Sequence, residues 1–387
     1  MLKDAYARFF ADNGDALHVT AHSHHPWPDV TREAHLQYWS DSARLTNEKW
    51  EKIFGEVVPE AQAHIARWIG WPSPARIAFA PNTHELVARL YSCLDWSRPV
   101  RVLTTASEFH SFSRQTRRLE ETGHVLVSRI PAEPFETFAD RFRDALTLGY
   151  DLVFVSHVFY DSGFLVDDLE NLITDTPDHT LVAVDGYHAV GAVPVDVSRL
   201  ADRIFYLGGG YKYLQAGEGA CFMALPPHAD ALRPAFTGWF ANFRGLAGDE
   251  ENEIAYGPDA MRFWGATFDA APLYRLNAVM RLYESRGVDA FAIREHVVAL
   301  MERFLERLDT MSPDLMPVGT LVPPIAVPRG NFVAFEPERA TEVEWRLLAR
   351  RILVDRRGHR VRFGFGVYHD LDFVDRLVVR MGEALGA

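Results

Sequence analysis

Two short segments decide the fold of this chain: Val184-Asp185-Gly186-Tyr187-His188 and Gly208-Gly209-Gly210-Tyr211-Lys212-Tyr213-Leu214. In the first, a strongly apolar run ends in the acid Asp185. In the second, a short apolar run ends in glycines that lead to Lys212. A lysine amine can hold pyridoxal 5′-phosphate as a Schiff base, and a carboxylate keeps its pyridine nitrogen protonated so that the ring accepts electrons. A surface lysine in a glycine turn after a buried strand would explain these residues equally well.

The pattern around these segments alternates between strands and helices. Apolar runs of strand length lie at Arg76–Ala80, Val100–Thr104, Val125–Ile130, Leu152–His157, Leu181–Asp185, Ile204–Gly208 and Ala220–Leu225. Amphipathic helical patterns lie between several of them, at Thr83–Leu94, Ser111–Thr122 and Phe135–Leu148. This alternation predicts an α/β fold, with a mostly parallel sheet of the seven-stranded type sandwiched by helices.

The last third of the chain has a different pattern. Long helical patterns at Ala270–Arg286 and Asp289–Asp309 precede short strands at Asn331–Phe335 and Val361–Phe365, and a final helix starts near Asp370. A chain of 387 residues is long for one core and suggests about two domains. We expect an N-terminal segment (1–45) that packs on both domains, a large domain (46–268) and a smaller α+β domain (269–387).

Composition limits the classes of partner. The net charge of −13 argues against nucleic acid or an anionic membrane as a partner. With only Cys93 and Cys221 present, no disulfide framework can be inferred, and a reducing compartment is expected. The N-terminus does not have the pattern of a secretory signal and no run reaches membrane-spanning length, so we expect a cytoplasmic protein.

The two opening segments belong to longer stretches that resemble kynureninase, within the class V aminotransferase family of fold-type-I pyridoxal-phosphate enzymes. The segments that carry the resemblance are 185–191 (DGYHAVG), 211–219 (YKYLQAGEG), 80–83 (APNT), Phe109, 156–163 (SHVFYDSG), 238–240 (GWF) and 362–365 (RFGF). The resemblance spans roughly residues 75 to 387. It implies a bound pyridoxal 5′-phosphate, an amino-acid substrate and a homodimer with active sites at the interface.

The predicted phosphate site lies where a strand leads into a helix. Asn82 or Thr83 can cap that helix, and a helix N-terminus offers N–H groups and a positive dipole end to an anion. Ordinary capping explains both residues as well, whereas the resemblance assigns them to the cofactor phosphate. It also implies that the hydroxyls of Ser156 and Tyr211 contact the cofactor, and that Trp239 and Thr267 reach across the dimer interface.

The resemblance further implies the residues around the cofactor ring. Phe109 would stack on the pyridine face, although a core phenylalanine would look the same. Asp185 would pair with the ring nitrogen, and His188 would lie near the same ring. Lys212 would carry the cofactor and act as the catalytic base, with Tyr211 as a possible relay for protons.

Substrate recognition rests on an arginine and on a histidine-rich element. By resemblance, Arg362 holds the substrate α-carboxylate, a task that suits a planar guanidinium. Arg360, two residues away on the same face of a strand, is its rival. His24 and His25, in the segment His22–Pro28, are predicted to line the substrate side of the pocket.

The same segment, His22-Ser23-His24-His25-Pro26-Trp27-Pro28, allows two other interpretations. Histidines at strand spacing suit zinc or copper, but no cysteine or acid follows at ligand spacing, so we expect no metal. The prolines could also simply fix the entry into a helix that begins near Asp29. Kynureninases carry a glycine-asparagine-serine element here and a later histidine-bearing loop. This chain has neither in recognisable form, which puts the identity of the substrate in doubt.

The nearest resemblance implies hydrolytic cleavage of the β–γ carbon–carbon bond of a kynurenine-type amino acid. There are three alternatives: transamination of an amino acid with a keto acid, a reaction of another class V lyase, and a protein that binds pyridoxal phosphate without turnover. Cysteine desulfuration fits poorly, because Cys93 falls inside a predicted helix and Cys221 inside a predicted strand.

Overall fold

A seven-stranded mixed sheet forms the centre of the larger body of the molecule. The computed structural model describes residues 1–243, 245 and 253–386. The strands are β2 (Ile77–Ala80), β3 (Val100–Thr105), β4 (Val125–Ile130), β5 (Leu152–Ser156), β6 (Leu181–Asp185), β7 (Ile204–Gly209) and β8 (Cys221–Ala224). Their order is β2-β8-β7-β6-β5-β3-β4; β8 is antiparallel to both of its neighbours, β2 and β7, and the other pairs are parallel. The predicted fold class and all seven predicted strands are confirmed.

Burial explains why these segments form strands. Every residue of β2, β5, β6, β7 and β8 is buried, as expected for strands covered by helices on both faces. The edge strand β4 is only partly covered, and its Leu126 is 57% exposed. The covering helices are α4 (Val58–Ile69), α5 (Thr83–Tyr91), α6 (His110–Glu121), α7 (Phe138–Leu146) and α8 (Leu169–Ile173).

Helix α5 ends earlier than its sequence pattern predicts. Cys93 lies two residues beyond its last residue, Tyr91, in a turn. The Trp96 indole N–H donates to the Tyr91 carbonyl (3.0 Å), and the Ser92 hydroxyl donates to the Arg89 carbonyl (2.8 Å). These side chains bind carbonyls of the last turn and so stop the helix. The prediction that Cys93 lies inside this helix is therefore wrong, whereas Cys221 lies in β8 as predicted.

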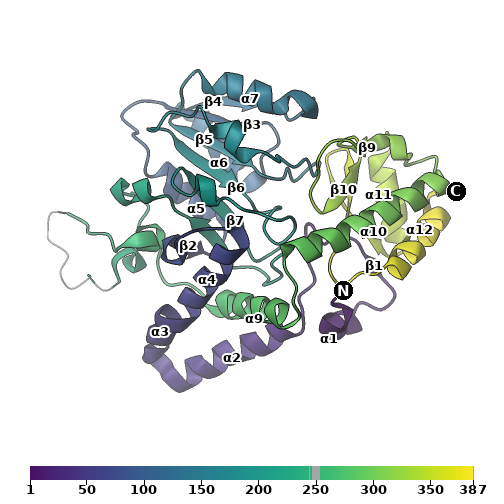
Figure 1. The fold of residues 1–387 in the computed structure, drawn as a ribbon, viewed down its shortest axis with the longest axis horizontal. Helices are drawn as coiled ribbons and strands as arrows, with labels where there is room; N and C mark the ends of the chain where they lie inside the picture. Colours follow the sequence, from purple (N-terminus) through teal and green to yellow (C-terminus); the bar gives the residue numbers. More distant parts are fainter. Residues whose placement is uncertain (244, 246–252, 387) are drawn as a thin grey trace.

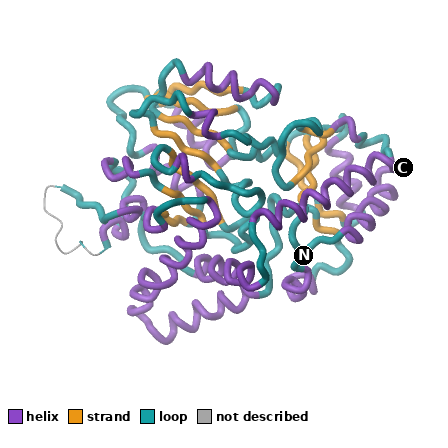
Figure 2. Tube along the Cα trace, viewed as in Figure 1, coloured by secondary structure: helices purple, strands orange, loops and turns teal. Residues whose placement is uncertain are grey.

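The smaller body is built on a four-stranded antiparallel sheet in the order β12-β13-β10-β9. Its strands are β9 (Leu321–Val322), β10 (Phe332–Phe335), β12 (Asp355–Arg357) and β13 (Arg360–Gly364). Helices α10 (Ala290–Met311), α11 (Ala340–Ala349) and α12 (Leu371–Leu385) pack with it. The two groups of strands are well separated in Figure 2, and α10 extends from the larger body along the smaller one in Figure 1.

The N-terminal segment connects both bodies. After α1 (Ala7–Ala11), β1 (Leu17–His18) pairs in parallel with β11 (Ile352–Leu353) of the smaller body. The chain then crosses to α2 (Val30–Leu45), which packs against α9 (Ala271–Ser285) beside the larger body (Figure 1). Short helix α3 (Lys49–Lys52) follows.

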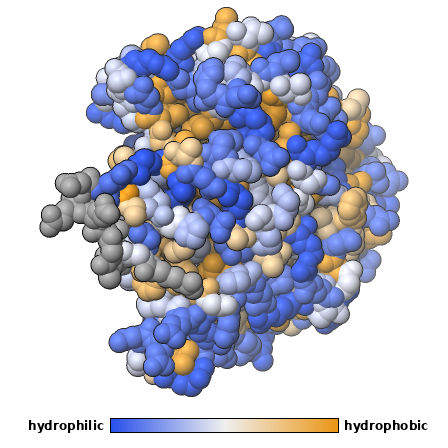
Figure 3. Space-filling model, turned by 60° about the vertical axis from the view of Figure 1, so that its left-hand side comes forward, coloured by the Kyte–Doolittle hydropathy of each residue, from blue (hydrophilic) through white to orange (hydrophobic). Residues whose placement is uncertain are grey.

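The surface is mainly hydrophilic. Hydrophilic residues predominate on the face drawn in Figure 3, and hydrophobic residues form separate patches. No helix within the described residues combines the length and the apolar character that a bilayer crossing requires.

The crossing N-terminal segment is held against the loop that follows Lys212. Gly217 has a φ of +70°, and a Cβ at this position would overlap the Trp27 ring. The Arg275 guanidinium lies 5.1 Å from the centre of that ring and donates to the carbonyls of Ala216 and Glu218 (2.6 and 2.7 Å). Trp27 and Arg275 therefore fix the Lys212 loop to the N-terminal segment.

We predict that Gly217→Ala destabilises the protein more than Gly149→Ala does. Both glycines have a positive φ (+70° and +72°), but a Cβ at Gly149 would meet no atom within 4 Å. The overlap with Trp27 should lower the free energy of unfolding by about 1–3 kcal/mol beyond the strain that both variants share. Urea unfolding of the two variants measures the difference. Equal destabilisation would contradict the close contact between Trp27 and the loop.

Candidate active site

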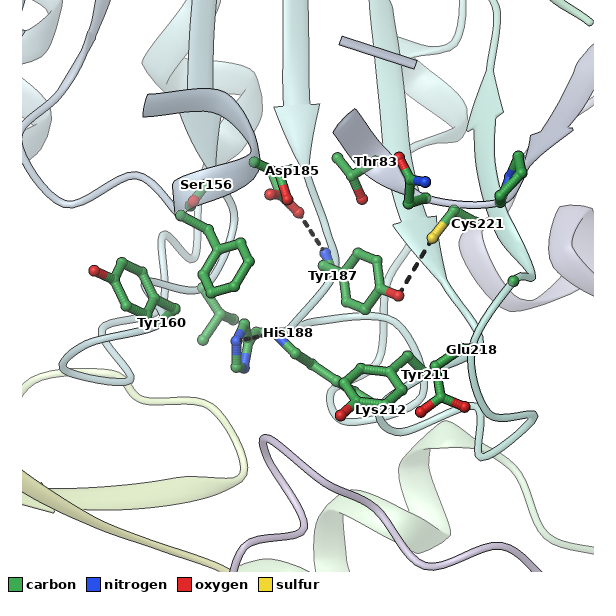
Figure 4. Close-up of a pocket in the computed structure, with 16 residues that line it drawn as sticks. Thr83, Ser156, Tyr160, Asp185, Tyr187, His188, Tyr211, Lys212, Glu218 and Cys221 are labelled. Atoms are coloured by element: carbon green, nitrogen blue, oxygen red, sulfur yellow. Dashed lines mark hydrogen bonds between the residues drawn. The ribbon is translucent and has the colours of Figure 1, made fainter. Parts of the chain in front are cut away.

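A cavity of about 230 Å³ opens at the carboxyl ends of β5 and β6, in front of the N-terminus of α5. In open parallel sheets, ligands bind in the crevice at this edge. The predicted site residues that line it are Asn82, Thr83, Phe109, Ser156, Asp185, His188, Tyr211 and Lys212 (Figure 4). Tertiary folding thus brings together residues from five separate segments of the chain.

Lys212 projects into this cavity from the turn after β7. Its Nζ forms a hydrogen bond with Nε2 of His188 and lies 4.9 Å from the centre of the Tyr187 ring. The side chain is buried, and burial lowers the pKa of Lys212 to about 7, although the charge of Asp185 acts in the opposite direction. A substantial fraction of the amine is therefore uncharged near neutral pH, the form that attacks a carbonyl.

Asp185 is the last residue of β6 and lies at the floor of the cavity. One carboxylate oxygen accepts a hydrogen bond from the Tyr187 backbone N–H at 2.9 Å. Burial raises the pKa of Asp185, while that N–H and the charge of Lys212 lower it. The following residue must be glycine, because a Cβ at Gly186 would overlap the Tyr206 ring, and the tight turn directs the carboxylate into the cavity.

The N-terminus of α5 forms another wall. The Asn82 side chain accepts a hydrogen bond from the Glu85 N–H at 3.0 Å, so Asn82 is the N-cap, and Thr83 is buried at the first helical position. First-turn amides that lack an intrahelical partner, together with the positive end of the helix dipole, favour an anion here. The wall suits the phosphate predicted from the sequence.

Aromatic side chains define the remaining walls. The Phe109 ring lies 5.2 Å from Lys212 Nζ and is packed edge-on by Tyr160, with ring centres 5.2 Å apart. Tyr160, Tyr187, Glu218 and Cys221 also line the cavity, and the sequence analysis did not select them. Tyr160 could have been predicted from the sequence, because it lies four residues after the end of β5 within the segment 156–163, which carries the family resemblance.

The residues present fit pyridoxal 5′-phosphate. An amine, a carboxylate, an aromatic ring and a helix N-terminus surround one cavity, which matches the donors and acceptors of that cofactor. His188 is buried, and its Nδ1 has no hydrogen-bond partner among the described residues. This orphaned polar atom points to a group that the protein itself does not supply.

Arg362 lies behind the cavity wall and is only 1% exposed. Its Nε and Nη2 donate to the two carboxylate oxygens of Asp355, both at 2.7 Å, and its Nη1 donates to the Tyr160 carbonyl. Burial raises the pKa of Asp355, but the contacts with His22 and Arg362 outweigh it and hold that pKa far below the usual range. Arg362 therefore contacts the backbone carbonyl of Tyr160, a residue that lines the cavity.

The rival arginine has different partners. Arg360 pairs with Glu336 (2.8 Å), Asp161 (3.4 Å) and Glu133. Asp161 and Glu133 belong to the larger body, so Arg360 ties the two bodies together. Each of these three ion pairs joins Arg360 to an acidic residue of the same chain, so the role that they indicate for Arg360 is structural.

The histidine-rich element divides into exposed and buried members. His24 is exposed and packs edge-on against Tyr211, with ring centres 5.9 Å apart, so it lies beside the cavity. His25 is buried against Tyr368 (5.2 Å) with its Nδ1 2.9 Å from the Pro26 carbonyl oxygen, and it does not line the cavity. His22 is buried and stacks on Phe332 at 4.7 Å. The described residues contain no group of three or more potential metal ligands.

Trp239 and Thr267 lie away from the cavity of their own chain. The Trp239 indole N–H donates to the Thr267 hydroxyl at 3.2 Å, and the Trp239 side chain is 39% exposed while its ring stacks on Phe240. The two predicted residues are thus joined to each other, and their contact with a second subunit stays a prediction.

Comparison with known proteins supports the family expected from these segments. The sequence model of the family "Aminotransferase class-V" matches residues 20–377. The uncharacterized aminotransferase YcbU of Bacillus subtilis (strain 168) is 24% identical over 336 residues, which cover 86% of this chain and 85% of YcbU. A kynureninase of Burkholderia mallei (strain SAVP1) is 29% identical over 228 residues, 57% of this chain and 53% of the kynureninase. The match thus spans about half the length of that kynureninase.

Solved structures show the same fold. A cysteine desulfurase from Thermococcus onnurineus NA1 superposes with a TM-score of 0.83 at 19% identity, covering 100% of this chain and 98% of the other. The cysteine desulfurase CsdA from Escherichia coli superposes with a TM-score of 0.79 at 17% identity, covering 98% and 97%. At these identities the similarity concerns the fold alone.

The buried histidines predict that the protein is labile to acid. Burial lowers the pKa of His25 to about 3, and the Pro26 carbonyl only partly offsets this. Because the folded pKa lies below the unfolded value of about 6.5, the unfolded state binds the proton first as the pH falls. Stability is therefore full above about pH 6.5 and is lost below it, by up to about 1.4 kcal/mol per pH unit for this one histidine.

The test is urea unfolding of His25→Asn and of the wild type between pH 6.5 and 4.5. We expect a shallower loss of stability with falling pH in the variant, whatever its stability at neutral pH. His24→Asn is the matched control, since that neighbouring side chain is exposed, and it should keep the wild-type slope. Identical slopes for His25→Asn and the wild type would contradict this role of His25.

Proposed function

This chain belongs to the class-V aminotransferase family of pyridoxal-phosphate enzymes, and on that premise we propose that it hydrolyses the β–γ carbon–carbon bond of a kynurenine-type amino acid. The observation that carries the proposal is the single cavity in which Lys212, Asp185 and His188 meet in front of the α5 N-terminus. The kynureninase similarity adds support, as does the aromatic lining supplied by Phe109 and Tyr160.

Each residue has a definite task in this proposal. When bound, pyridoxal phosphate supplies an electron sink that stabilises negative charge at the substrate α-carbon. Lys212 holds the cofactor covalently and, once released, moves the proton at the α-carbon, for which a pKa of about 7 is well suited. Asp185 would retain the proton on the ring nitrogen, and Phe109 would pack against the ring face. Tyr211, which lines the cavity, would relay protons to the side chain being cleaved.

Arg362 is the residue that we assign to the substrate α-carboxylate. A guanidinium has five N–H groups, and three of those on Arg362 are engaged with Asp355 and Tyr160. These bonds leave one N–H on Nη1 and one on Nη2 unaccounted for among the described residues, and in our proposal these two donate to the substrate carboxylate. Asp355 fixes the orientation of this pair.

Trp239 and Thr267 support a homodimer with shared active sites. Their hydrogen-bonded pair is partly exposed and does not serve the cavity of its own chain. In our proposal this pair completes the cavity of a second subunit, in keeping with the resemblance to kynureninase. His24, beside Tyr211, is the member of the histidine-rich element that we assign to the substrate side.

A class V aminotransferase is the second candidate. YcbU, named an uncharacterized aminotransferase, is similar along 86% of this chain, whereas the kynureninase match covers 57%. Transamination needs only proton transfer between the substrate and the cofactor, so it makes fewer demands on the cavity.

Incubation with L-kynurenine tests the proposed reaction. We expect anthranilate and alanine as products, and no turnover by Lys212→Ala, because that variant lacks both the cofactor link and the base. A parallel incubation with a panel of amino acids and a keto acid tests transamination. Conversion of the cofactor to its pyridoxamine form without cleavage of kynurenine would sink the hydrolase proposal and favour the aminotransferase. Absence of turnover with every substrate would favour a binding protein.

Arg362→Lys should weaken substrate binding while retaining the charge that balances Asp355. Lysine can replace only one of the two hydrogen bonds to the carboxylate, and the loss of the other, at about 1.5–3 kcal/mol for a bond to a charged group, raises KM about 10–100-fold. Steady-state kinetics measure the change, and the cofactor content of the variant shows that the cavity is intact.

Arg360→Lys is the matched control on the same strand, because Arg360 is held by acids of the chain. Its KM should stay near the wild-type value. A similar rise of KM in both variants would contradict a role of Arg362 in substrate binding. It would indicate that either substitution disturbs the strand and so changes KM indirectly.

A further inference from the structure

Glu108 is a buried acid that the proposed chemistry does not use. It immediately precedes Phe109, between the end of β3 and the start of α6, and is 3% exposed. It does not line the cavity. Its two carboxyl oxygens contact Thr105 at the end of β3 and Ser156 at the end of β5.

The hydrogen bonds of Glu108 distinguish its two oxygens. Oε1 accepts from the Ser156 backbone N–H (3.1 Å) and from the Thr105 hydroxyl (2.7 Å). The Thr105 hydroxyl in turn accepts from the Ser107 N–H (3.2 Å), so its own hydrogen is directed to Glu108. Within the described part of the chain, the hydrogen-bond partner of Oε2 is the Ser156 hydroxyl, at 2.6 Å. Since Oε1 already receives two hydrogens, a proton bound by Glu108 belongs on Oε2.

The position of that proton sets the direction of the Ser156 hydroxyl. When Glu108 is a carboxylate, Ser156 Oγ must donate to Oε2, and it offers the cavity only lone pairs. When Glu108 is protonated on Oε2, the acid donates to Ser156 Oγ instead. The hydrogen of Ser156 is then free to point into the cavity, which Ser156 lines.

We propose that Glu108 is a positioning residue whose protonated form turns the Ser156 hydroxyl into a hydrogen-bond donor toward the bound cofactor. The inference rests on the proposed function in one respect, that Ser156 contacts the cofactor. At neutral pH the phosphate of the cofactor and the deprotonated hydroxyl oxygen on its ring both accept hydrogen bonds. A Ser156 hydroxyl that donates therefore binds either group, whereas a Ser156 hydroxyl that offers only lone pairs repels it.

The electrostatic surroundings favour the protonated form. Burial raises the pKa of Glu108 to about 8, against the hydrogen bonds from Ser156 and Thr105, and the charge of Asp185 raises it further. The titratable groups that face it are Asp185 on β6 and Tyr160 after β5, and Lys212 acts on Asp185. Cofactor affinity should therefore fall as the pH rises through about 8.

The test uses the protein freed of cofactor and the probe 4′-deoxypyridoxine 5′-phosphate, which has no aldehyde and cannot react with Lys212. Tryptophan fluorescence gives its dissociation constant from pH 6.5 to 9.5. In Glu108→Gln, the amide N–H₂ donates permanently to Ser156 Oγ, while the amide oxygen accepts from Thr105 and the Ser156 N–H. The wild type should lose about 5–10-fold more affinity across this range than Glu108→Gln, the worth of one hydrogen bond.

Subtraction of the two profiles removes the titration of the probe itself and of Lys212, which both proteins share. Ser156→Ala provides a second, independent comparison, because without the hydroxyl the variant should also lack the extra loss of affinity at high pH. Coincident profiles for the wild type and both variants would overturn the inference about Glu108 alone. Failure of the wild type to bind the probe at any pH would overturn the proposed function, and the inference with it.

Discussion

The burial of Lys212 beside Asp185 is the constraint on which the rest of the structure depends. Two opposite charges lie in the interior at the ends of adjacent strands, where desolvation disfavours the charged form of each. The turn glycine after Asp185 and the glycines before Lys212 allow the backbone to bring both groups to one cavity. The sheet order β7-β6-β5 then determines which further residues, above all Ser156, can join them.

Around this pair, several buried polar groups have partners within the protein. Asp355 neutralises Arg362, the Tyr206 hydroxyl bonds His157 at 2.9 Å, and Glu108 is satisfied by two hydroxyls and an amide. His188 Nδ1 is an exception, with no partner among the described residues. A buried polar group without a partner costs free energy, so its presence in the cavity is consistent with a site shaped for a ligand.

Local sequence patterns predicted most of the larger body. The fully buried strands have continuous apolar runs, and the Asn82-Thr83 cap marks a helix start, because both signals depend only on neighbouring residues. Apolar periodicity failed at the end of α5, because it does not register that the Ser92 hydroxyl and the Trp96 indole bind the last carbonyls and close the helix before Cys93. Tyr160 was missed although it lies within a family-like motif, because the packing of its ring against Phe109 at the cavity is a tertiary contact.

The sequence by itself determined the family and the cofactor, because the motifs that carry the resemblance can be recognised without the fold, and it named eight of the residues that line the cavity. Only the tertiary structure decided which partners each of the two neighbouring arginines has, which histidine lies beside the cavity, and that Glu108 is in contact with Ser156. These outcomes depend on partners far away in sequence, such as Asp355, Asp161 and Tyr368. No local pattern encodes which of several similar side chains meets a distant charge or ring, since that choice is made by packing.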